Sequence, residues 1–295
     1  MRRRRTFLHC YPIVLQSSQA HARRRGRGLV LFVEHRPAGR LAPFVRMLWY
    51  TRDAQARGRT THQRVLPTGR LQVILSVAER GLTDCSGAAD AESAAGLIVG
   101  VQMQWEKIAE ADLEDLMGIV FEPGGFAAMF PEGAAAFSGQ SIDLEDVDGG
   151  WARSLRDQVR EQGGVEGRFS VVEAALERRL RGSRSGVVDF ALREIRRGTA
   201  VGEITRQTGL SAGALGERFR YQVGTTLKVY ARIARFTDAV ARMHRGVAVR
   251  WVELAADCGY YDQAHFCNEF RAFSGVCPSE YAATDRVWAN HLAID

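Results

Sequence analysis

An internal repeat in the C-terminal third constrains this 295-residue chain more than any other feature. Each copy places a glycine between two short segments with apolar residues at helical spacing, and glycine ends a helix in the left-handed conformation at little cost. The repeat therefore predicts two helix-turn-helix units. The repeated pairs are Gly209 with Gly259 and, with one extra residue in the second turn, Leu215 with Phe266, Phe219 with Phe270, Gly224 with Gly275, and Tyr230 with Tyr281.

The second copy, residues 251–281, shows the pattern most clearly. Its first helix carries an apolar stripe that ends at Cys258, Gly259 follows as the turn, and Asp262 stands where an N-cap belongs. From Asp262 to Phe273, inward-facing and outward-facing residues follow each other at periods of three and four. Two short helices across such a turn suit insertion of the second helix into a DNA major groove.

A helix expected from Thr225 to His244 joins the two units. At about 1.5 Å per residue it spans about 30 Å, which is close to the ~34 Å between successive major grooves on one face of B-DNA. The spacing therefore predicts that one chain places two recognition helices in successive grooves. The alternative is that two helical hairpins stack to build a core with no role in DNA binding.

The rest of the chain predicts an α+β protein. Runs such as Leu29–His35 and Leu116–Phe121 favour strands, and amphipathic segments at 143–162 and 171–181 follow them. A glycine-serine break at Gly182–Gly186 marks a domain boundary. We therefore expect a basic disordered tail over residues 1–28, a β-rich sensor or dimerisation domain over residues 29–182 that ends in helices, the double helix-turn-helix domain over residues 183–284, and a C-terminal tail over residues 285–295.

Charge and cysteine content limit the function classes. The formal net charge is +6, and the basic excess is greatest in residues 1–40, with 10 Lys and Arg against 1 Asp or Glu. Five cysteines match neither a disulfide framework nor a zinc knuckle, which indicates a reducing, cytoplasmic setting. The sequence contains no run of about 18 apolar residues, so no membrane-spanning helix is predicted. The arginines at residues 2–5 resemble an export signal only superficially, because the apolar run after them is short and broken by His9 and Pro12; a basic tail, or upstream sequence read from an early start, is preferred.

Residues 182–283 resemble the DNA-binding domain of the AraC/XylS family of transcription regulators. Many fixed spacings coincide, and the second unit with its preceding helix matches best. The residues that carry the resemblance are Ile204, Gly209, Leu210, Ser211, Leu215, Phe219, Arg220, Gly224, Tyr230 and Arg235 in the first half, and Leu254, Ala255, Cys258, Gly259, Tyr260, Asp262, Gln263, Ala264, His265, Phe266, Glu269, Phe270, Arg271, Gly275, Pro278 and Tyr281 in the second.

Carried over by position, the resemblance implies which residues meet DNA. The base-contacting residues would be Gln263, Ala264, His265, Cys267 and Asn268, and the two amides can pair bidentately with adenine. The first recognition helix has Gly213, Gly216 and Glu217 at the equivalent positions, so we expect it to contribute mainly backbone contacts. The residues expected at the DNA backbone are Ser211, Arg218, Arg220, Tyr221, Tyr261 and Arg271.

The segments 66–69, 99–102 and 120–125 resemble the β-rich, cupin-like domains that precede such DNA-binding domains in actinobacterial-type members. The resemblance implies that the first domain senses a small molecule or dimerises. His35 and His62 stand alone and make no His-x-His pair, so no metal or cofactor is expected. Six aromatic residues are expected in the core, with an apolar ligand pocket as the alternative: Trp49, Tyr50, Trp105, Phe121, Phe126 and Phe130.

These features together predict a cytoplasmic, sequence-specific transcription regulator that is not an enzyme. Its expected partners are double-stranded DNA, RNA polymerase, a small-molecule effector and a second copy of the chain. An architectural DNA-binding protein without sequence preference is one alternative. The other is an enzyme domain fused to an AraC-type DNA-binding domain, although no Ser/His/Asp or paired-carboxylate arrangement stands out.

Overall fold

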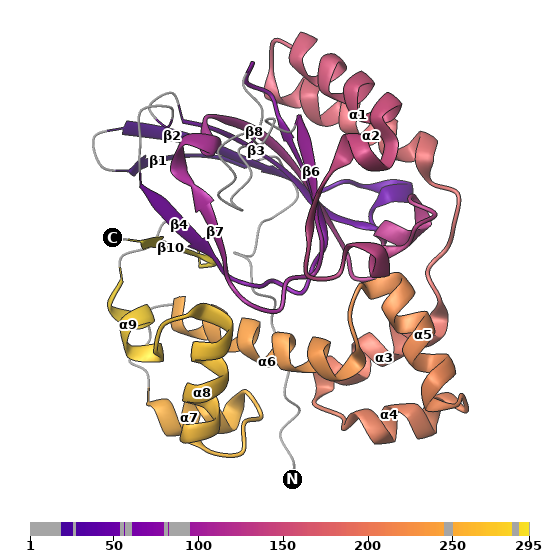
Figure 1. Ribbon diagram of the computed structural model, residues 1–295, viewed down its shortest axis with the longest axis vertical. Helices are drawn as coiled ribbons and strands as arrows, with labels where there is room; N and C mark the ends of the chain where they lie inside the picture. Colours follow the sequence, from indigo (N-terminus) through magenta and orange to yellow (C-terminus); the bar gives the residue numbers. More distant parts are fainter. Residues whose placement is uncertain are drawn as a thin grey trace.

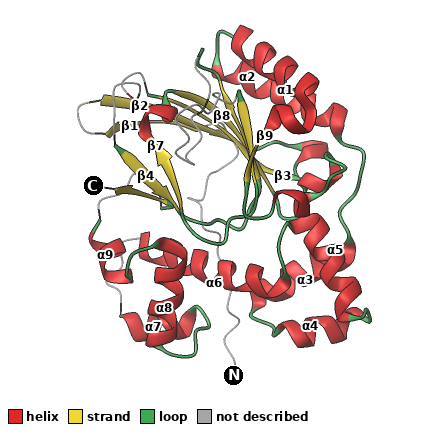
Figure 2. Cartoon of the chain, viewed as in Figure 1, coloured by secondary structure: helices red, strands yellow, loops and turns green. Residues whose placement is uncertain are grey.

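The computed structural model describes residues 19–25, 28–53, 56, 61–79, 82, 95–244, 250–284 and 289–294. A β-rich first half is followed by a helical second half, which confirms the predicted α+β class (Figure 1). The sheets occupy one side of the molecule and the helix-turn-helix region the other (Figure 2). No helix within these described residues is long and apolar enough to cross a membrane.

Two antiparallel sheets form the first domain. Within the described residues the larger sheet has the order β1-β2-β3-β8-β5-β6-β9 and the smaller one the order β10-β4-β7. The strands are β1 (Gln19–Arg25), β2 (Gly28–His35), β3 (Val45–Arg52), β4 (His62–Val65), β5 (Gln72–Ser76), β6 (Gly96–Val99), β7 (Glu106–Ala109), β8 (Asp115–Phe121), β9 (Ser141–Asp143) and β10 (His291–Ile294).

The core of the first domain lies between the larger sheet and the helices α1 (Leu144–Glu161) and α2 (Val165–Arg179). Its aromatic centre follows the predicted assignment, because Tyr50, Phe121, Phe126 and Phe130 are at most 2% exposed. The rings of Phe126 and Phe130 stack with their centroids 4.3 Å apart. The rings of Phe121, Phe126 and Phe130 contact one another, as expected of core residues. The other two predicted core aromatics, Trp49 and Trp105, are half-buried.

Two segments that the sequence assigns to tails are strands. Strand β1 pairs with β2 in register from Gln19 with Glu34 to Arg25 with Gly28, so disorder over residues 1–28 is wrong for residues 19–25. The C-terminal tail returns as β10, which pairs with β4 between His291 and Val65. Strand pairing uses backbone groups, so an arginine-rich or isolated segment can join a sheet edge without an apolar run. Residues 1–18, 26–27, 285–288 and 295 lie outside the described residues.

The second domain contains two helical units that share one long helix. Each unit has its own core, and α6 contributes Leu227 and Tyr230 to the first core and Ile233 and Phe236 to the second. The 18 residues of α6 span about 27 Å at ~1.5 Å per residue. The helices are α3 (Gly186–Arg197), α4 (Val201–Thr208), α5 (Ala212–Val223), α6 (Leu227–His244), α7 (Trp251–Asp257), α8 (Gln263–Ser274) and α9 (Pro278–Ala283).

Both domains contribute to the core of the second unit. Leu66 and Val101 of the first domain and Leu292 of β10 pack with the residues of α6, α7 and α8. The hydroxyl of Tyr281 donates a hydrogen bond to the carbonyl oxygen of Ala289 at 2.6 Å, and the N–H of Leu66 donates to the carbonyl oxygen of Asn290 at 2.8 Å. The end of the chain therefore ties the second helix-turn-helix unit to the smaller sheet.

Candidate nucleic-acid interface

The two units have equivalent turns and helix ends. Gly209 and Gly259 follow α4 and α7 with φ of 68° and 80°, and Gly224 and Gly275 end α5 and α8 with φ of 87° and 73°. A residue with a side chain adopts this left-handed conformation only at a cost, which explains why glycine recurs at all four positions. The predicted repeat is therefore present in the backbone.

The N-terminal ends of the two recognition helices are also alike. The hydroxyl oxygen of Ser211 accepts the N–H of Ala214 at 3.2 Å, and the carboxylate of Asp262 accepts the N–H of His265 at 2.7 Å. These contacts confirm Asp262 as the N-cap of α8 and give α5 the same type of cap. Behind each cap, the repeated residues Leu215 and Phe266 are 0% exposed.

The N-terminal half of α8 carries the predicted base-contacting residues, of which Cys267 packs against the core of the second unit. Gln263, Ala264 and Asn268 are exposed, whereas His265 and Cys267 are half-buried. Tyr261, in the turn before the helix, is 92% exposed. Arg271 is exposed one turn further along α8. This arrangement leaves two amide side chains, a methyl group and a phenol free for a ligand that lies along the helix.

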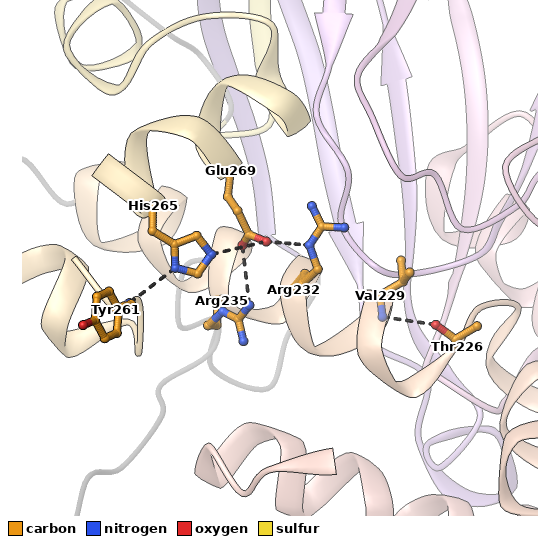
Figure 3. Close-up of polar contacts among 7 residues, drawn as sticks. All are labelled: Thr226, Val229, Arg232, Arg235, Tyr261, His265 and Glu269. Atoms are coloured by element: carbon orange, nitrogen blue, oxygen red, sulfur yellow. Dashed lines mark hydrogen bonds and ion pairs between the residues drawn. The ribbon is translucent and has the colours of Figure 1, made fainter. Parts of the chain in front are cut away.

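His265 is held in place by two contacts on α8 and its preceding turn (Figure 3). Its Nδ1 accepts the N–H of Tyr261 at 3.4 Å, and its Nε2 lies 3.8 Å from the carboxylate of Glu269. An Nδ1 atom that accepts a hydrogen bond leaves the ring proton on Nε2. The imidazole is therefore oriented by contacts within the second unit.

Glu269 joins the recognition helix to α6. It is 8% exposed, and its carboxylate accepts a hydrogen bond from Nε of Arg232 at 2.5 Å and lies 3.5 Å from Nη2 of Arg235 (Figure 3). A buried carboxylate needs such partners, because it loses its hydration on folding. This structural role of Glu269 was not predicted from the sequence, although the residue lies between Phe266 and Phe270 on the inner face of α8.

The first recognition helix presents fewer side chains. A Cβ atom at Gly213 would lie 4.0 Å from Oγ of Ser211 and one at Gly216 would lie 3.9 Å from Nη2 of Arg220, and Glu217 is exposed. The predicted backbone-contacting residues Ser211, Arg218 and Arg220 are exposed. The surface of α5 thus offers guanidinium and hydroxyl groups and little for reading base edges.

Tyr221 faces the first domain. Its hydroxyl donates a hydrogen bond to the carbonyl oxygen of Pro131 at 3.1 Å, and a Cβ atom built on Gly133 would lie 2.4 Å from its ring. The side chain predicted at the DNA backbone is therefore bound to another part of the same chain in this arrangement. The sequence could not show this contact, because Tyr221 and Pro131 are 90 residues apart.

Cys258, where the predicted apolar stripe ends, is buried. It is 3% exposed, and its Sγ lies 3.6 Å from Oδ2 of Asp238. Burial raises the pKa of Cys258, and the nearby carboxylate of Asp238 adds to the shift. The thiol therefore stays protonated and packs as a small apolar group.

Comparison with known families agrees with the C-terminal geometry. Residues 204–284 match the family model described as a helix-turn-helix domain, and residues 33–143 match a domain of unknown function, DUF6597. The C-terminal region is thus a helix-turn-helix DNA-binding domain of the AraC type, which confirms the resemblance found in the sequence. The cupin-like character of the first domain stays a prediction. No curated protein matches the chain.

Solved structures of ToxT from Vibrio cholerae are similar to the chain at low identity. One has a TM-score of 0.38, 11% identity, and covers 75% of this chain and 89% of that one. ToxT bound to (E)-4-(8-methylnaphthalen-1-yl)but-3-enoic acid has a TM-score of 0.37 and 13% identity, and the match covers 75% of this chain and 89% of that one. Unsaturated fatty acid bound ToxT has a TM-score of 0.38 and 12% identity, and the match covers 76% of this chain and 95% of that one. Because the TM-scores and identities are low, the bound ligands are described for ToxT and not for this chain.

Proposed function

We propose that this protein is a sequence-specific transcription regulator that acts in the cytoplasm and has no enzymatic activity. The observation that carries the proposal is the pair of N-capped recognition helices, α5 and α8, at opposite ends of α6 (Figure 1). The length of α6 is close to the repeat of the major groove on one face of DNA. The two recognition helices of one chain then lie in successive grooves of one asymmetric site.

The second unit supplies the sequence preference in this proposal. Gln263 and Asn268 are exposed near the N-terminal end of α8, where recognition helices meet base edges, and each amide can pair with adenine. Ala264 adds a methyl-sized apolar contact, and the half-buried Cys267 follows it three residues later on α8. His265 contributes through the ring edge that its contacts with Tyr261 and Glu269 leave available.

The first unit and the flanking residues supply backbone affinity. Arg218, Arg220 and Arg271 are exposed cations, and Ser211 and Tyr261 offer hydroxyl groups beside the N-termini of α5 and α8. Phosphate contacts of this kind fix the register of a protein on DNA without reading its sequence. The glycines of α5 fit a helix whose backbone approaches the DNA closely.

The first domain contacts the C-terminal ends of both recognition helices, and we infer that it controls them through these contacts. Gly224 at the C-terminal end of α5 lies against Ala134, where an added Cβ would be 2.9 Å from the carbonyl oxygen. Gly275 at the equivalent end of α8 lies against Trp105 and Arg64. Near the N-terminal ends of the two helices, Ser211 and Gln263 are exposed. A change in the first domain, caused by a small molecule, a second copy of the chain or RNA polymerase, would shift both helices together.

Selection of bound sequences from random duplexes tests the proposal. With the full chain at about 0.15 M salt, we expect one base-specific segment, read by α8, and protection of the DNA backbone about one helical turn away, where α5 lies. The specificity ratio should be about 10³ or more. Equal affinity for all duplexes, with a steep dependence on salt, would instead establish an architectural DNA-binding protein.

A further inference from the structure

A cleft of about 600 Å³ lies where the two domains and the two helix-turn-helix units meet. The turn Thr68–Arg70 of the first domain faces α6 across it, and the α3–α4 connection and the end of α7 close its two sides. A cleft of this volume is within the range that holds a small organic ligand. Neither family model assigns a ligand to it.

The floor of the cleft is apolar. Ile233 is 1% exposed and Tyr230 is 7% exposed, and Ala231 and Ala234 lie beside them on α6. Gly69 covers Ile233 and Tyr230, since a Cβ atom at that position would be 3.2 Å from Cγ2 of Ile233. The half-buried Ala231 and Ala234 are therefore the apolar residues of α6 that suit the hydrocarbon part of a ligand.

The walls carry an excess of positive charge. Five arginines line the cleft against three acidic residues. Each acidic residue is paired with an arginine outside the lining: Glu122 with Arg46 at 3.5 Å, and Asp238 and Asp257 with Arg242 at 3.0 and 3.1 Å. The five lining arginines are Arg70, Arg184, Arg196, Arg197 and Arg235.

Arg196 stands apart among these arginines. Arg184, Arg197 and Arg235 pair with Asp189, Glu194 and Glu269, respectively. Arg196 is half-buried on the last turn of α3 and has no hydrogen-bond or ion-pair partner among the described residues.

The α3–α4 connection strengthens the preference for an anion. Helix α4 begins on the cleft wall at Val201. Its N-cap Ala200 offers no side chain to accept the N–H groups of Val201 and Gly202, whereas the N–H of Glu203 donates to the carbonyl oxygen of Ala200 at 3.0 Å. The N-terminal end of a helix carries a partial positive charge, which adds to that of Arg196. Both features belong to the same wall.

We propose that this cleft binds a small organic anion, with its apolar body on α6 and its acidic group between Arg196 and the start of α4. The inference rests on the proposed function for its meaning, because such a ligand would touch both domains and both units and would change how they are held together. Binding itself can be measured without DNA.

Two fluorescent probes that differ only in charge test the proposal on the full chain. We expect anilinonaphthalene sulfonate to bind at one site, and its uncharged analogue phenylnaphthylamine to bind about tenfold or more weakly, since it lacks the group that meets the arginine. Arg196→Glu should weaken sulfonate binding at least about tenfold and leave binding of the neutral probe within about twofold.

The matched control is Arg193→Glu, an exposed position on α3 outside the cleft. It makes the same change of charge on the same helix, so sulfonate binding should stay within about twofold. Ala234→Trp fills the floor and should weaken both probes, with circular dichroism confirming the fold. Equal losses in Arg196→Glu and Arg193→Glu, or equal affinity for both probes, would overturn the proposal.

A second measurement separates a free anion from DNA phosphate. Affinity for a nonspecific duplex, and its salt slope, should be the same in Arg196→Glu and Arg193→Glu. A lower slope in Arg196→Glu alone would make Arg196 a DNA contact and overturn the site. Failure of the proposed function would show differently, as duplex selection without any sequence preference while the sulfonate still binds the cleft.

Discussion

The contact between the first domain and the recognition helices can be isolated by comparing two glycines of the same conformation. Gly224 and Gly209 have φ of 87° and 68°, so alanine at either position incurs the left-handed backbone cost of about 1–2 kcal/mol. At Gly209 nothing lies within 4 Å of the new methyl group. At Gly224 the methyl group would be 2.9 Å from the carbonyl oxygen of Ala134, which is backbone and cannot rotate away.

The extra cost at Gly224 is that of overpacking, about 1–3 kcal/mol. Because one kcal/mol shifts the melting temperature of a chain of this size by roughly 2–4 °C, Gly224→Ala should melt about 2–12 °C below Gly209→Ala. Thermal unfolding of the full chain followed by circular dichroism measures the difference. Gly275→Ala and Gly259→Ala form a second pair, with a smaller expected difference because the groups that Gly275 meets are side chains of Trp105 and Arg64.

Equal melting temperatures for Gly224→Ala and Gly209→Ala would refute the reasoning. The result would mean that α5 does not contact Ala134 in solution, so the first domain would not restrain the first recognition helix through this contact. DNA affinity of the same two variants then tells whether the contact restrains binding, since only Gly224→Ala disturbs it.

Further outcomes can be checked with the selected DNA site. Gln263→Ala or Asn268→Ala should lose about 1–3 kcal/mol at particular base pairs, and an equal loss on every sequence would exclude direct readout by that residue. Arg271→Ala should weaken all duplexes alike and reduce the salt slope by about one, as seen in fluorescence anisotropy at several salt concentrations. Glu269→Gln should lower stability by about 1–3 kcal/mol in urea unfolding, because it removes the charge that Arg232 and Arg235 share; an unchanged midpoint would show that the bridge contributes nothing. Tyr221→Phe keeps the ring and removes its hydrogen bond, so stability should fall by about 1 kcal/mol while DNA affinity stays constant, whereas lost affinity would support its predicted backbone contact.

The sequence by itself determined the helical repeat. Glycines that end helices, the N-caps Ser211 and Asp262, and apolar residues at helical spacing all act within a few residues of the chain, so each can be read locally. The outer face of α8 followed for the same reason, because residues such as Gln263 and Asn268 are exposed once the inner face is fixed by Phe266 and Phe270.

Only the tertiary structure decided how these units are held. Strand β10 joins β4 through backbone groups that any sequence carries, and Tyr221 meets Pro131 across 90 residues of chain. The role of Glu269 depends on how α8 crosses α6, and the cleft exists because seven separate stretches of the chain converge. Such contacts depend on the packing of elements that are distant in sequence, and a local sequence pattern does not predict them.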